Sequence, residues 1–202
     1  MNTDTQLFVD INDFARATPW LHGIVLAYAN DGIVVFAALM LAGWWSARRQ
    51  ANPVRMAAAV WTPLGMLLAL GLNQPLSAMV GEPRPYATLQ NILVLAHHSK
   101  DPAFPSDHAV MAGAVAAGLF LVSKRLGWVT AVLAIVMAFS RVYIAAHYPW
   151  DVAAGLVAGA VVSLLGFVVV RRLLVWLVEL AERTALRPVF TSTSARADSA
   201  AG

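Results

Sequence analysis

Long apolar runs, separated by short polar segments, dominate the pattern of the chain. A helix needs roughly 20 apolar residues to cross the hydrocarbon core of a bilayer, and about five of the runs approach that length. The predicted spans are residues 21–45, 54–72, 106–124, 128–143 and 151–170. In the last span, Gly155 and Gly159 have a spacing that favours close helix packing. The sequence therefore predicts an all-α fold, a polytopic membrane bundle of about five spanning helices.

Two features near the N-terminus refine this pattern. Residues 4–17 place apolar side chains at helical intervals with acidic side chains on the other side, which predicts an amphipathic helix in the membrane interface. The first predicted span is interrupted by Asn30 and Asp31. Two interpretations remain open: the polar pair lies on a buried face, or the span begins later, near Ile33.

Composition supports a membrane protein. Of the 202 residues, 59% are hydrophobic and 12% are charged, and the mean hydropathy is +0.67. These values exclude an ordinary soluble domain. Residues 1–187 are predicted to form a single domain and residues 188–202 a disordered cytoplasmic tail. Because the chain has no cysteine, disulfides and thiolate metal sites are excluded.

The net charge of +3 comes from basic residues at the ends of the apolar runs, so it indicates membrane topology rather than binding to nucleic acid. With five spans, these residues fall on one side, which the positive-inside rule makes cytoplasmic. They are Arg48, Arg49, Arg55, Lys124, Arg125, Arg171 and Arg172. The loop 73–105 and the stretch 140–151 are then predicted to face outside.

Two short stretches, residues 105–108 and 140–151, place a histidine beside groups that can hold an anion, at the edge of an apolar run. Ionisable side chains are costly at such positions, so they indicate function. The proline-rich loop 73–105, which contains Arg84, is also longer than is usual in a compact domain without a functional role.

Hydrolysis of a phosphate ester needs positive donors around the phosphoryl oxygens, an in-line nucleophile and an acid for the leaving oxygen. Arg84 and Arg141 can each make bidentate contacts with phosphate oxygens. Ser106 and the backbone N–H groups at the start of the third predicted span can add neutral donors. These residues predict a phosphate-binding site.

The nucleophile and the acid are predicted to be histidines. His147 and Asp151 are four residues apart, so the carboxylate can accept a hydrogen bond from one ring nitrogen and leave the other free to attack. His108, near the start of the neighbouring span, can protonate the leaving oxygen. His97 and His98 are predicted to have structural or interfacial roles.

The sequence resembles the type 2 phosphatidic acid phosphatase (PAP2) superfamily, whose signatures are Lys-x6-Arg-Pro, Pro-Ser-Gly-His and Ser-Arg-x5-His-x3-Asp. The third signature matches completely, as Ser140, Arg141, His147 and Asp151. The second matches as Pro105, Ser106, Asp107 and His108, with aspartate in place of glycine. This variant resembles the branch that dephosphorylates undecaprenyl pyrophosphate, a lipid carrier of bacterial cell-wall synthesis. The first signature matches only at Arg84 and Pro85.

The resemblance implies a role for each matched residue. His147 is the nucleophile that forms a phosphohistidine, Asp151 is its partner and His108 is the general acid. The expected phosphate-binding group is Arg84, Ser106, Arg141 and Asp107. The resemblance also implies that the reaction needs no metal or other cofactor.

The chain departs from the signatures at two positions. Ser77 occupies the lysine position of the first signature. The only lysines in the sequence are Lys100 and Lys124, and Lys124 is predicted to lie on the cytoplasmic side, so Lys100 is the candidate to replace the missing cation. Asp107 adds negative charge near the site, where it could hold Arg84 or tune His108.

The expected function is hydrolysis of undecaprenyl or another polyprenyl pyrophosphate to the monophosphate, which recycles a lipid carrier in cell-wall synthesis. The protein is expected in the bacterial cytoplasmic membrane, with its active site facing outside. The expected partners are this lipid substrate and the membrane, without nucleic acid, and the oligomeric state stays open. One alternative is a phosphatase for phosphatidic acid or phosphatidylglycerol phosphate. An alternative of another class is a non-catalytic lipid-binding or transport protein.

Overall fold

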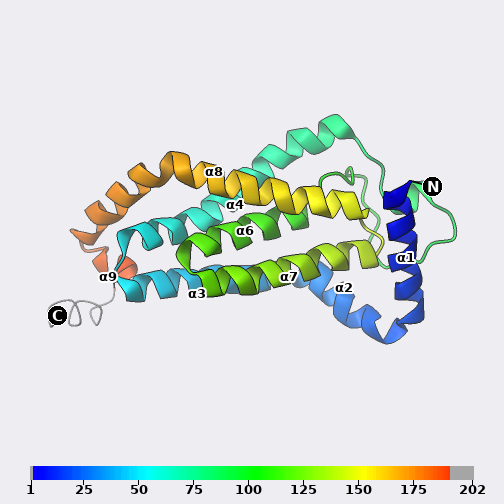
Figure 1. Ribbon diagram of the computed structural model, residues 1–202, viewed down its shortest axis with the longest axis horizontal. Helices are drawn as coiled ribbons and strands as arrows, with labels where there is room; N and C mark the ends of the chain where they lie inside the picture. Colours follow the sequence, from blue (N-terminus) through cyan, green and yellow to red (C-terminus); the bar gives the residue numbers. More distant parts are fainter. Residues whose placement is uncertain (1, 192–202) are drawn as a thin grey trace.

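The computed structural model describes residues 2–191, which are helical almost throughout and contain no strand. Figure 1 shows the long helices side by side along one axis, with α1 across one end. The elements are α1 (Thr3–Ala17), η1 (Pro19–Leu21), α2 (His22–Asp31), α3 (Ile33–Gln50), α4 (Pro53–Val80), α5 (Pro85–Thr88), α6 (Asp107–Val122), α7 (Lys124–Tyr143), α8 (Pro149–Glu182) and α9 (Arg187–Phe190). The predicted all-α bundle is confirmed.

Among the described residues, three helices are long and apolar enough to cross a membrane. They are α4 with its continuation to Thr88, α7 and α8. The bent pair Pro19–Asp31 and Ile33–Gln50 would form a fourth span. Because α6 has 16 residues, it is shorter than the other candidates, and the predicted count of five spans is not confirmed.

The polar interruption of the first predicted span marks a bend. Helices α2 and α3 meet at Gly32 with an angle of 56° between the two segments. A Cβ atom at Gly32 would overlap the Tyr28 carbonyl oxygen and the Met137 side chain, so only glycine fits this approach. Asn30 and Asp31 are exposed at the end of α2. The first interpretation, a polar pair on a buried face, is therefore wrong, and a new helix begins at Ile33.

The prediction that a loop begins at residue 73 is wrong, because α4 continues to Val80. Pro75 removes one backbone donor but does not end the helix, and the buried side chain of Asn73 finds partners on the segment that begins α6. The helix ends at Gly81, which has a φ of 63° and donates its N–H to the Ser77 carbonyl at 3.0 Å. Two further turns of α4 thus reach the site.

Helix α6 lies at the centre of the bundle, in contact with α4, α7 and α8 (Figure 1). Close packing against α8 depends on residues without a side chain. A Cβ at Gly113 would overlap the Leu156 carbonyl, and one at Gly159 would overlap the Val110 carbonyl. The predicted role of the α8 glycines in close packing is confirmed.

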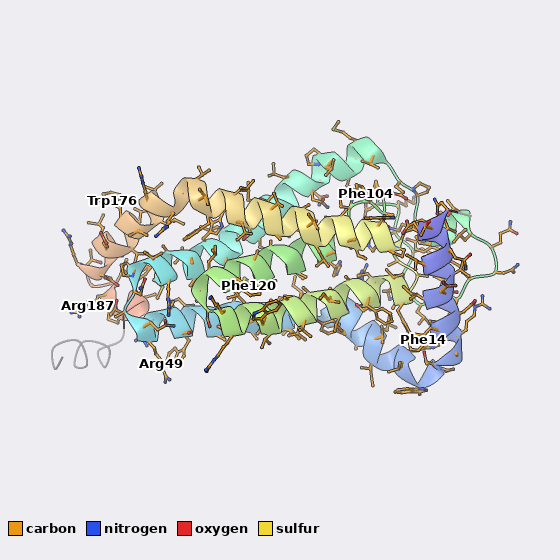
Figure 2. All side chains as sticks on the ribbon, viewed as in Figure 1. Phe14, Arg49, Phe104, Phe120, Trp176 and Arg187 are labelled. Atoms are coloured by element: carbon orange, nitrogen blue, oxygen red, sulfur yellow. The ribbon has the colours of Figure 1, made fainter. Side chains whose placement is uncertain are left out.

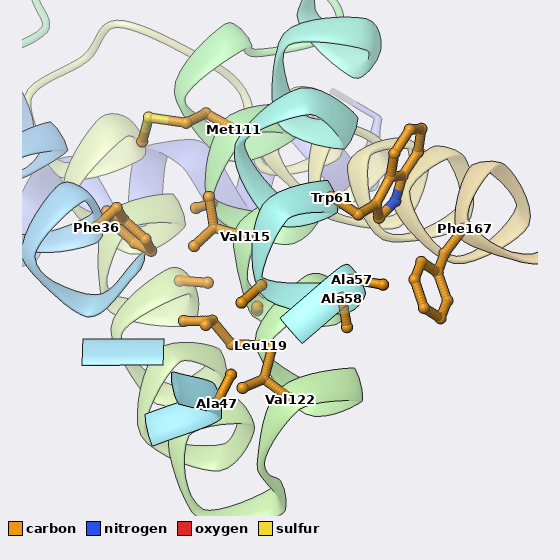
Figure 3. Close-up of a cluster of buried hydrophobic side chains, with 14 of the residues drawn as sticks. Phe36, Ala47, Ala57, Ala58, Trp61, Met111, Val115, Leu119, Val122 and Phe167 are labelled. Atoms are coloured by element: carbon orange, nitrogen blue, oxygen red, sulfur yellow. The ribbon is translucent and has the colours of Figure 1, made fainter. Parts of the chain in front are cut away.

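A buried apolar cluster holds these helices together below the site, and Figure 3 shows part of it. Its labelled members come from α3, α4, α6 and α8: Phe36, Ala47, Ala57, Ala58, Trp61, Met111, Val115, Leu119, Val122 and Phe167. The indole of Trp61 donates a hydrogen bond to the Ser163 carbonyl at 2.8 Å, which joins α4 to α8. The cluster fixes the framework from which the site residues project.

The two ends of the bundle differ in composition. Figure 2 shows Arg49 and Arg187 at one end and Phe14 and Phe104 toward the other. At the basic end, Arg48 donates to the Pro188 carbonyl at 2.6 Å, which attaches α9 to α3. Of the predicted tail, residues 188–190 belong to α9, and residues 192–202 lie outside the described residues.

The amphipathic N-terminal helix is confirmed as α1, which lies across the other end of the bundle (Figure 1). The buried ring of Phe8 contacts the ring of Tyr148 edge-on, with 5.4 Å between centroids. Asp4 accepts a hydrogen bond from the backbone N–H of Trp150 at 3.0 Å, in the first turn of α8. Helix α1 therefore braces the segment that leads into α8.

Candidate active site

A cavity of about 660 Å³ lies at the α1 end of the bundle. Its walls come from the last turns of α4, the loop that follows, the first turn of α6, the end of α7 and the turn before α8. The lining residues are Gln74, Ser77, Ala78, Arg84, Asp101, Pro102, Pro105, Asp107, His108, Arg141 and His147. The structure thus brings Arg84, Asp107, His108, Arg141 and His147 together, as the sequence predicted.

His147 lies in the turn between α7 and α8, outside both helices. Its Nδ1 is 2.8 Å from the carbonyl oxygen of Ala103. Because a carbonyl can only accept, Nδ1 must carry the proton in this hydrogen bond, which leaves Nε2 with a free lone pair. Burial of the ring and the positive charges of Arg141 and Arg84 hold the pKa of His147 well below its usual value of 6.5. The imidazole is therefore neutral at neutral pH, and its Nε2 lone pair could attack an electrophile.

The turn that carries His147 is fixed at both sides. Ala145 has a φ of 64°, and the N–H of Ala146 donates to the Arg141 carbonyl at 3.0 Å. The Ile144 carbonyl accepts from the N–H groups of Leu95 and Ala96 at 3.2 and 2.9 Å. The chain thus reverses within a few residues and places His147 next to Arg141.

Asp151 is fully buried in the first turn of α8. Its Oδ2 accepts a hydrogen bond from the backbone N–H of Tyr148 at 2.7 Å and lies 3.5 Å from His147 Nδ1. The expected hydrogen bond between His147 and Asp151 is therefore not made, because Asp151 caps α8 and the Ala103 carbonyl takes the proton of Nδ1. At 3.5 Å the carboxylate still lies close enough to stabilise a positive imidazole.

Arg141 and Arg84 provide positive charge at the cavity wall. Arg141 is buried near the end of α7, donates from Nη1 to the Ala29 carbonyl at 3.1 Å, and has a buried Nε without a protein partner among the described residues. Arg84 donates from Nε to the Asp101 carbonyl at 2.9 Å and from Nη1 to the Ala146 carbonyl at 3.3 Å. These contacts orient both guanidinium groups and leave N–H groups available to an anion.

The start of α6 contributes neutral donors. Ser106 precedes the helix, and its backbone N–H donates to the Asp151 carbonyl at 3.1 Å. Its Oγ is buried and has no hydrogen-bond partner within residues 2–191. The close approach depends on Gly155, where a Cβ would lie 2.8 Å from the Ser106 carbonyl oxygen. A phosphate oxygen could satisfy the hydroxyl and the free N–H groups of this helix end.

Asp107 does not contact Arg84, contrary to one interpretation of the sequence. Its carboxylate instead accepts hydrogen bonds from Asn73 and Gln74 of α4. A carboxylate cannot donate to phosphate, so only the backbone N–H of Asp107 can serve as a phosphate ligand.

The missing lysine has no replacement at the cavity wall formed by the described part of the chain. Ser77 lines the cavity at the lysine position, whereas Lys100 is exposed and is not among the lining residues. His98 is exposed and packs against Tyr86 with the ring planes inclined by 59° and 4.5 Å between ring centroids, as fits a structural role. Within residues 2–191, no group of three or more His, Cys, Asp or Glu side chains could hold a metal ion.

Three contributors were missed from the sequence: the Ala103 carbonyl, Asn73 and Gln74. A backbone carbonyl has no sequence signature. The two amides, by contrast, interrupt an apolar helix, and polar residues in a span usually have a partner or a function. That signal could have identified Asn73 and Gln74.

Comparison with known proteins agrees with this geometry. Residues 58–174 match the PAP2 superfamily. The bacitracin transport permease protein BcrC of Bacillus licheniformis is 32% identical over 167 residues, which cover 83% of this chain and 79% of that protein. The undecaprenyl-diphosphatase BcrC of Bacillus subtilis is 26% identical over 162 residues, which cover 80% of this chain and 81% of that protein.

The fold agrees as well. The crystal structure of LpxE from Aquifex aeolicus matches with a TM-score of 0.67 at 23% sequence identity, over 82% of this chain and 94% of that one. The superfamily match covers more than half of the chain and includes every helix that lines the cavity. The chain is therefore a membrane phosphatase of the PAP2 superfamily.

Proposed function

We propose that this phosphatase hydrolyses a polyprenyl pyrophosphate, undecaprenyl pyrophosphate in particular, to the monophosphate through a phosphohistidine. The observation that carries the proposal is the hydrogen bond from His147 Nδ1 to the Ala103 carbonyl, which leaves Nε2 unprotonated in a cavity lined by Arg84 and Arg141. A lone pair beside two guanidinium groups is the arrangement that phosphoryl transfer to a histidine requires.

In the first step, Arg84, Arg141, the Ser106 hydroxyl and the N–H groups at the start of α6 hold the phosphoryl oxygens. Nε2 of His147 attacks phosphorus, and the bond from phosphorus to the leaving oxygen breaks. His108, which the negative charge of the bound substrate keeps protonated, donates a proton to that oxygen. The imidazole becomes positive because it keeps the proton on Nδ1. Asp151, at 3.5 Å from Nδ1, stabilises that charge.

In the second step, His108 accepts a proton from water as the water oxygen attacks the phosphohistidine. The bond between Nε2 and phosphorus breaks, and inorganic phosphate leaves with the neutral imidazole restored. His108 thus serves as acid and then as base.

Three observations support a pyrophosphate substrate. The Asp107 variant of the second signature resembles the undecaprenyl pyrophosphate branch, and a relative of similar length carries the name undecaprenyl-diphosphatase. The cavity, at about 660 Å³, has room for two phosphate groups. The name of the Bacillus licheniformis relative describes transport, but an oriented histidine in a cavity that two arginines also line favours catalysis in this chain.

We further propose that the protein lies in a bacterial cytoplasmic membrane with the cavity facing outside. The basic residues in the last turn of α3, the first turn of α4 and the first turn of α7 lie at the end of the bundle opposite the cavity, as the positive-inside rule requires for a cytoplasmic end. Hydrolysis there would return the lipid carrier of cell-wall synthesis to its monophosphate form.

Phosphate release from the purified protein in detergent, with EDTA present, tests the proposal. The substrates are undecaprenyl pyrophosphate, phosphatidic acid and phosphatidylglycerol phosphate, and His147→Ala is the control. We expect release from the pyrophosphate in preference to the two phospholipids, and none above background with His147→Ala. Preference for a phospholipid would show that this lipid, and not the pyrophosphate, is the substrate. Absence of release from all three would favour a non-catalytic lipid-binding protein.

A further inference from the structure

The side chain of Asp107 joins two helices at the wall of the cavity. Its Oδ1 accepts hydrogen bonds from Asn73 Nδ2 at 2.7 Å and from Gln74 Nε2 at 3.0 Å. Asn73 Nδ2 also donates to the carbonyl oxygen of Pro105 at 3.1 Å. Two adjacent amides of α4 therefore hold the residues on either side of Ser106.

This link is built from groups that are otherwise unfavourable at their positions. Asn73 is 3% exposed within an apolar helix, where an amide without partners would be destabilising. Asp107 brings a negative charge to the wall of an anion-binding cavity, which opposes the binding of phosphate. The hydrogen bonds satisfy the buried amide and direct the carboxylate oxygen toward α4.

The link acts on the part of α6 that needs an external support. The first turn of a helix has N–H groups without partners inside the helix, so it is held less firmly than the turns that follow. Asp107 is in that turn, and the next residue, His108, lines the cavity. A small rotation of this turn would move the His108 imidazole away from the leaving oxygen.

We propose that Asp107 is a positioning residue, whose hydrogen bonds to Asn73 and Gln74 hold the first turn of α6 so that His108 can protonate the leaving group. The inference rests on the proposed function, in which His108 is the general acid. Asp107 acts through geometry, so an uncharged oxygen acceptor at this position can replace it.

The test compares two aryl phosphates that carry the same alkyl tail, one with a nitrophenol and one with an unsubstituted phenol as leaving group. The phenol is the poorer leaving group and needs the acid more. Loss of a positioned acid reduces rates by about 10²- to 10⁴-fold, and imperfect positioning should cost less. For Asp107→Ala we expect kcat/KM, which reports transfer to His147 and not hydrolysis of the phosphohistidine, to fall by about 10- to 100-fold on the phenyl ester and only a few-fold on the nitrophenyl ester. His108→Ala should show the same dependence on the leaving group, more strongly.

Two further variants separate positioning from charge and from loss of the fold. In Asp107→Asn, the amide oxygen can still accept from Asn73 and Gln74. The ratio of kcat/KM on the phenyl ester to kcat/KM on the nitrophenyl ester should therefore stay within about threefold of the wild-type ratio. In Asn73→Asp, two carboxylates face each other, and activity on the phenyl ester should fall as with Asp107→Ala. The double variant Asn73→Asp/Asp107→Asn restores one donor and one acceptor and should recover about tenfold over Asn73→Asp.

Equal losses on both esters for Asp107→Ala, or full activity on both, would overturn the inference. So would a loss in Asp107→Asn as large as in Asp107→Ala, because that result would assign the effect to charge. If Asp107→Ala does not fold, as judged by its elution in detergent, Asp107→Asn and the double variant decide the question. A wild-type protein that releases phosphate from neither the aryl esters nor undecaprenyl pyrophosphate contradicts the proposed function itself, and the inference with it.

Discussion

His147 Nδ1 lies 2.8 Å from the Ala103 carbonyl oxygen and 3.5 Å from the Asp151 carboxylate. The nearer group, the Ala103 carbonyl, is neutral and orients the ring. The farther group, the Asp151 carboxylate, can stabilise the ring when it becomes positively charged. In the proposed mechanism, orientation and charge stabilisation, which one carboxylate performs in a catalytic triad, are thus divided between two groups.

Because the Ala103 carbonyl and Asp151 share these two tasks, we expect Asp151→Asn to reduce kcat only moderately. In a triad whose carboxylate bonds the base directly, the same change reduces kcat by about 10⁴-fold, because it selects the wrong tautomer. The Ala103 carbonyl keeps the tautomer of His147 in this protein, so kcat should fall by only about 10- to 100-fold. The amide oxygen introduced by Asp151→Asn can still accept from the Tyr148 N–H, so the variant should fold. A loss near 10⁴-fold in steady-state phosphate release would show that Asp151, and not Ala103, sets the tautomer.

Burial of a neutral His147 predicts a dependence of stability on pH. The pKa of His147 is well below 6.5 in the folded protein, whereas the unfolded chain has the ordinary value. As the pH falls below about 6.5, the unfolded state binds a proton that the folded state does not, so this residue lowers stability progressively. His147→Asn, whose amide N–H can replace Nδ1–H, should weaken the fall of the melting temperature between about pH 7 and pH 5. An unchanged slope would mean that His147 has the same pKa in the folded and the unfolded protein.

The contact between α6 and α8 predicts unequal effects of adding one methyl group to two glycines. A Cβ at Gly159 would overlap the Val110 carbonyl, while nothing lies within 4 Å of a Cβ at Gly71. Gly159→Ala should therefore destabilise the protein by about 1–3 kcal/mol, as overpacking does. Gly71→Ala should be neutral or stabilising by about 0.5–1 kcal/mol. Thermal unfolding in detergent compares the two, and equal melting temperatures would contradict the packing described here.

The proposed orientation predicts which cysteines an impermeant reagent can label in intact cells. The native chain has no cysteine, so each introduced cysteine is the only target. His97→Cys is exposed in the loop near the cavity, and Gln50→Cys is exposed at the opposite end of the bundle. We expect labelling of the first in intact cells and of the second only after lysis. The reverse pattern would place the cavity on the cytoplasmic side.

The pattern of apolar and polar residues along the chain predicted most of the helices. It failed where the structure of a segment depends on contacts with residues far away in the sequence. The apolar runs identified α6 and α7 closely, because burial in one long helix leaves a continuous signal. The run 151–170 identified the beginning of α8, which continues to Glu182. The end of α4 was predicted as a loop, since Asn73, Gln74 and Pro75 are typical of loops. These residues stay helical because Asp107, far along the chain, provides a partner for both amides.

The spacing of residues in the sequence likewise predicted which residues form the site, but not all of the contacts that they make. His108, Arg141 and His147, which the signatures identified, line one cavity, as expected. The spacing of His147 and Asp151 suggested a direct hydrogen bond, but Asp151 is committed to the start of α8. The competing acceptor is the backbone of Ala103, and where a loop backbone passes depends on the whole fold.

Trapping the phosphohistidine tests most directly whether Nε2 of His147 carries the phosphoryl group. The purified protein is mixed with undecaprenyl pyrophosphate labelled in its terminal phosphate and quenched in alkali, where a phosphohistidine survives. We expect label on the peptide that contains His147 in the wild type and none in His147→Asn. Label on another residue, or rapid turnover with no labelled protein at any time after mixing, would contradict the account.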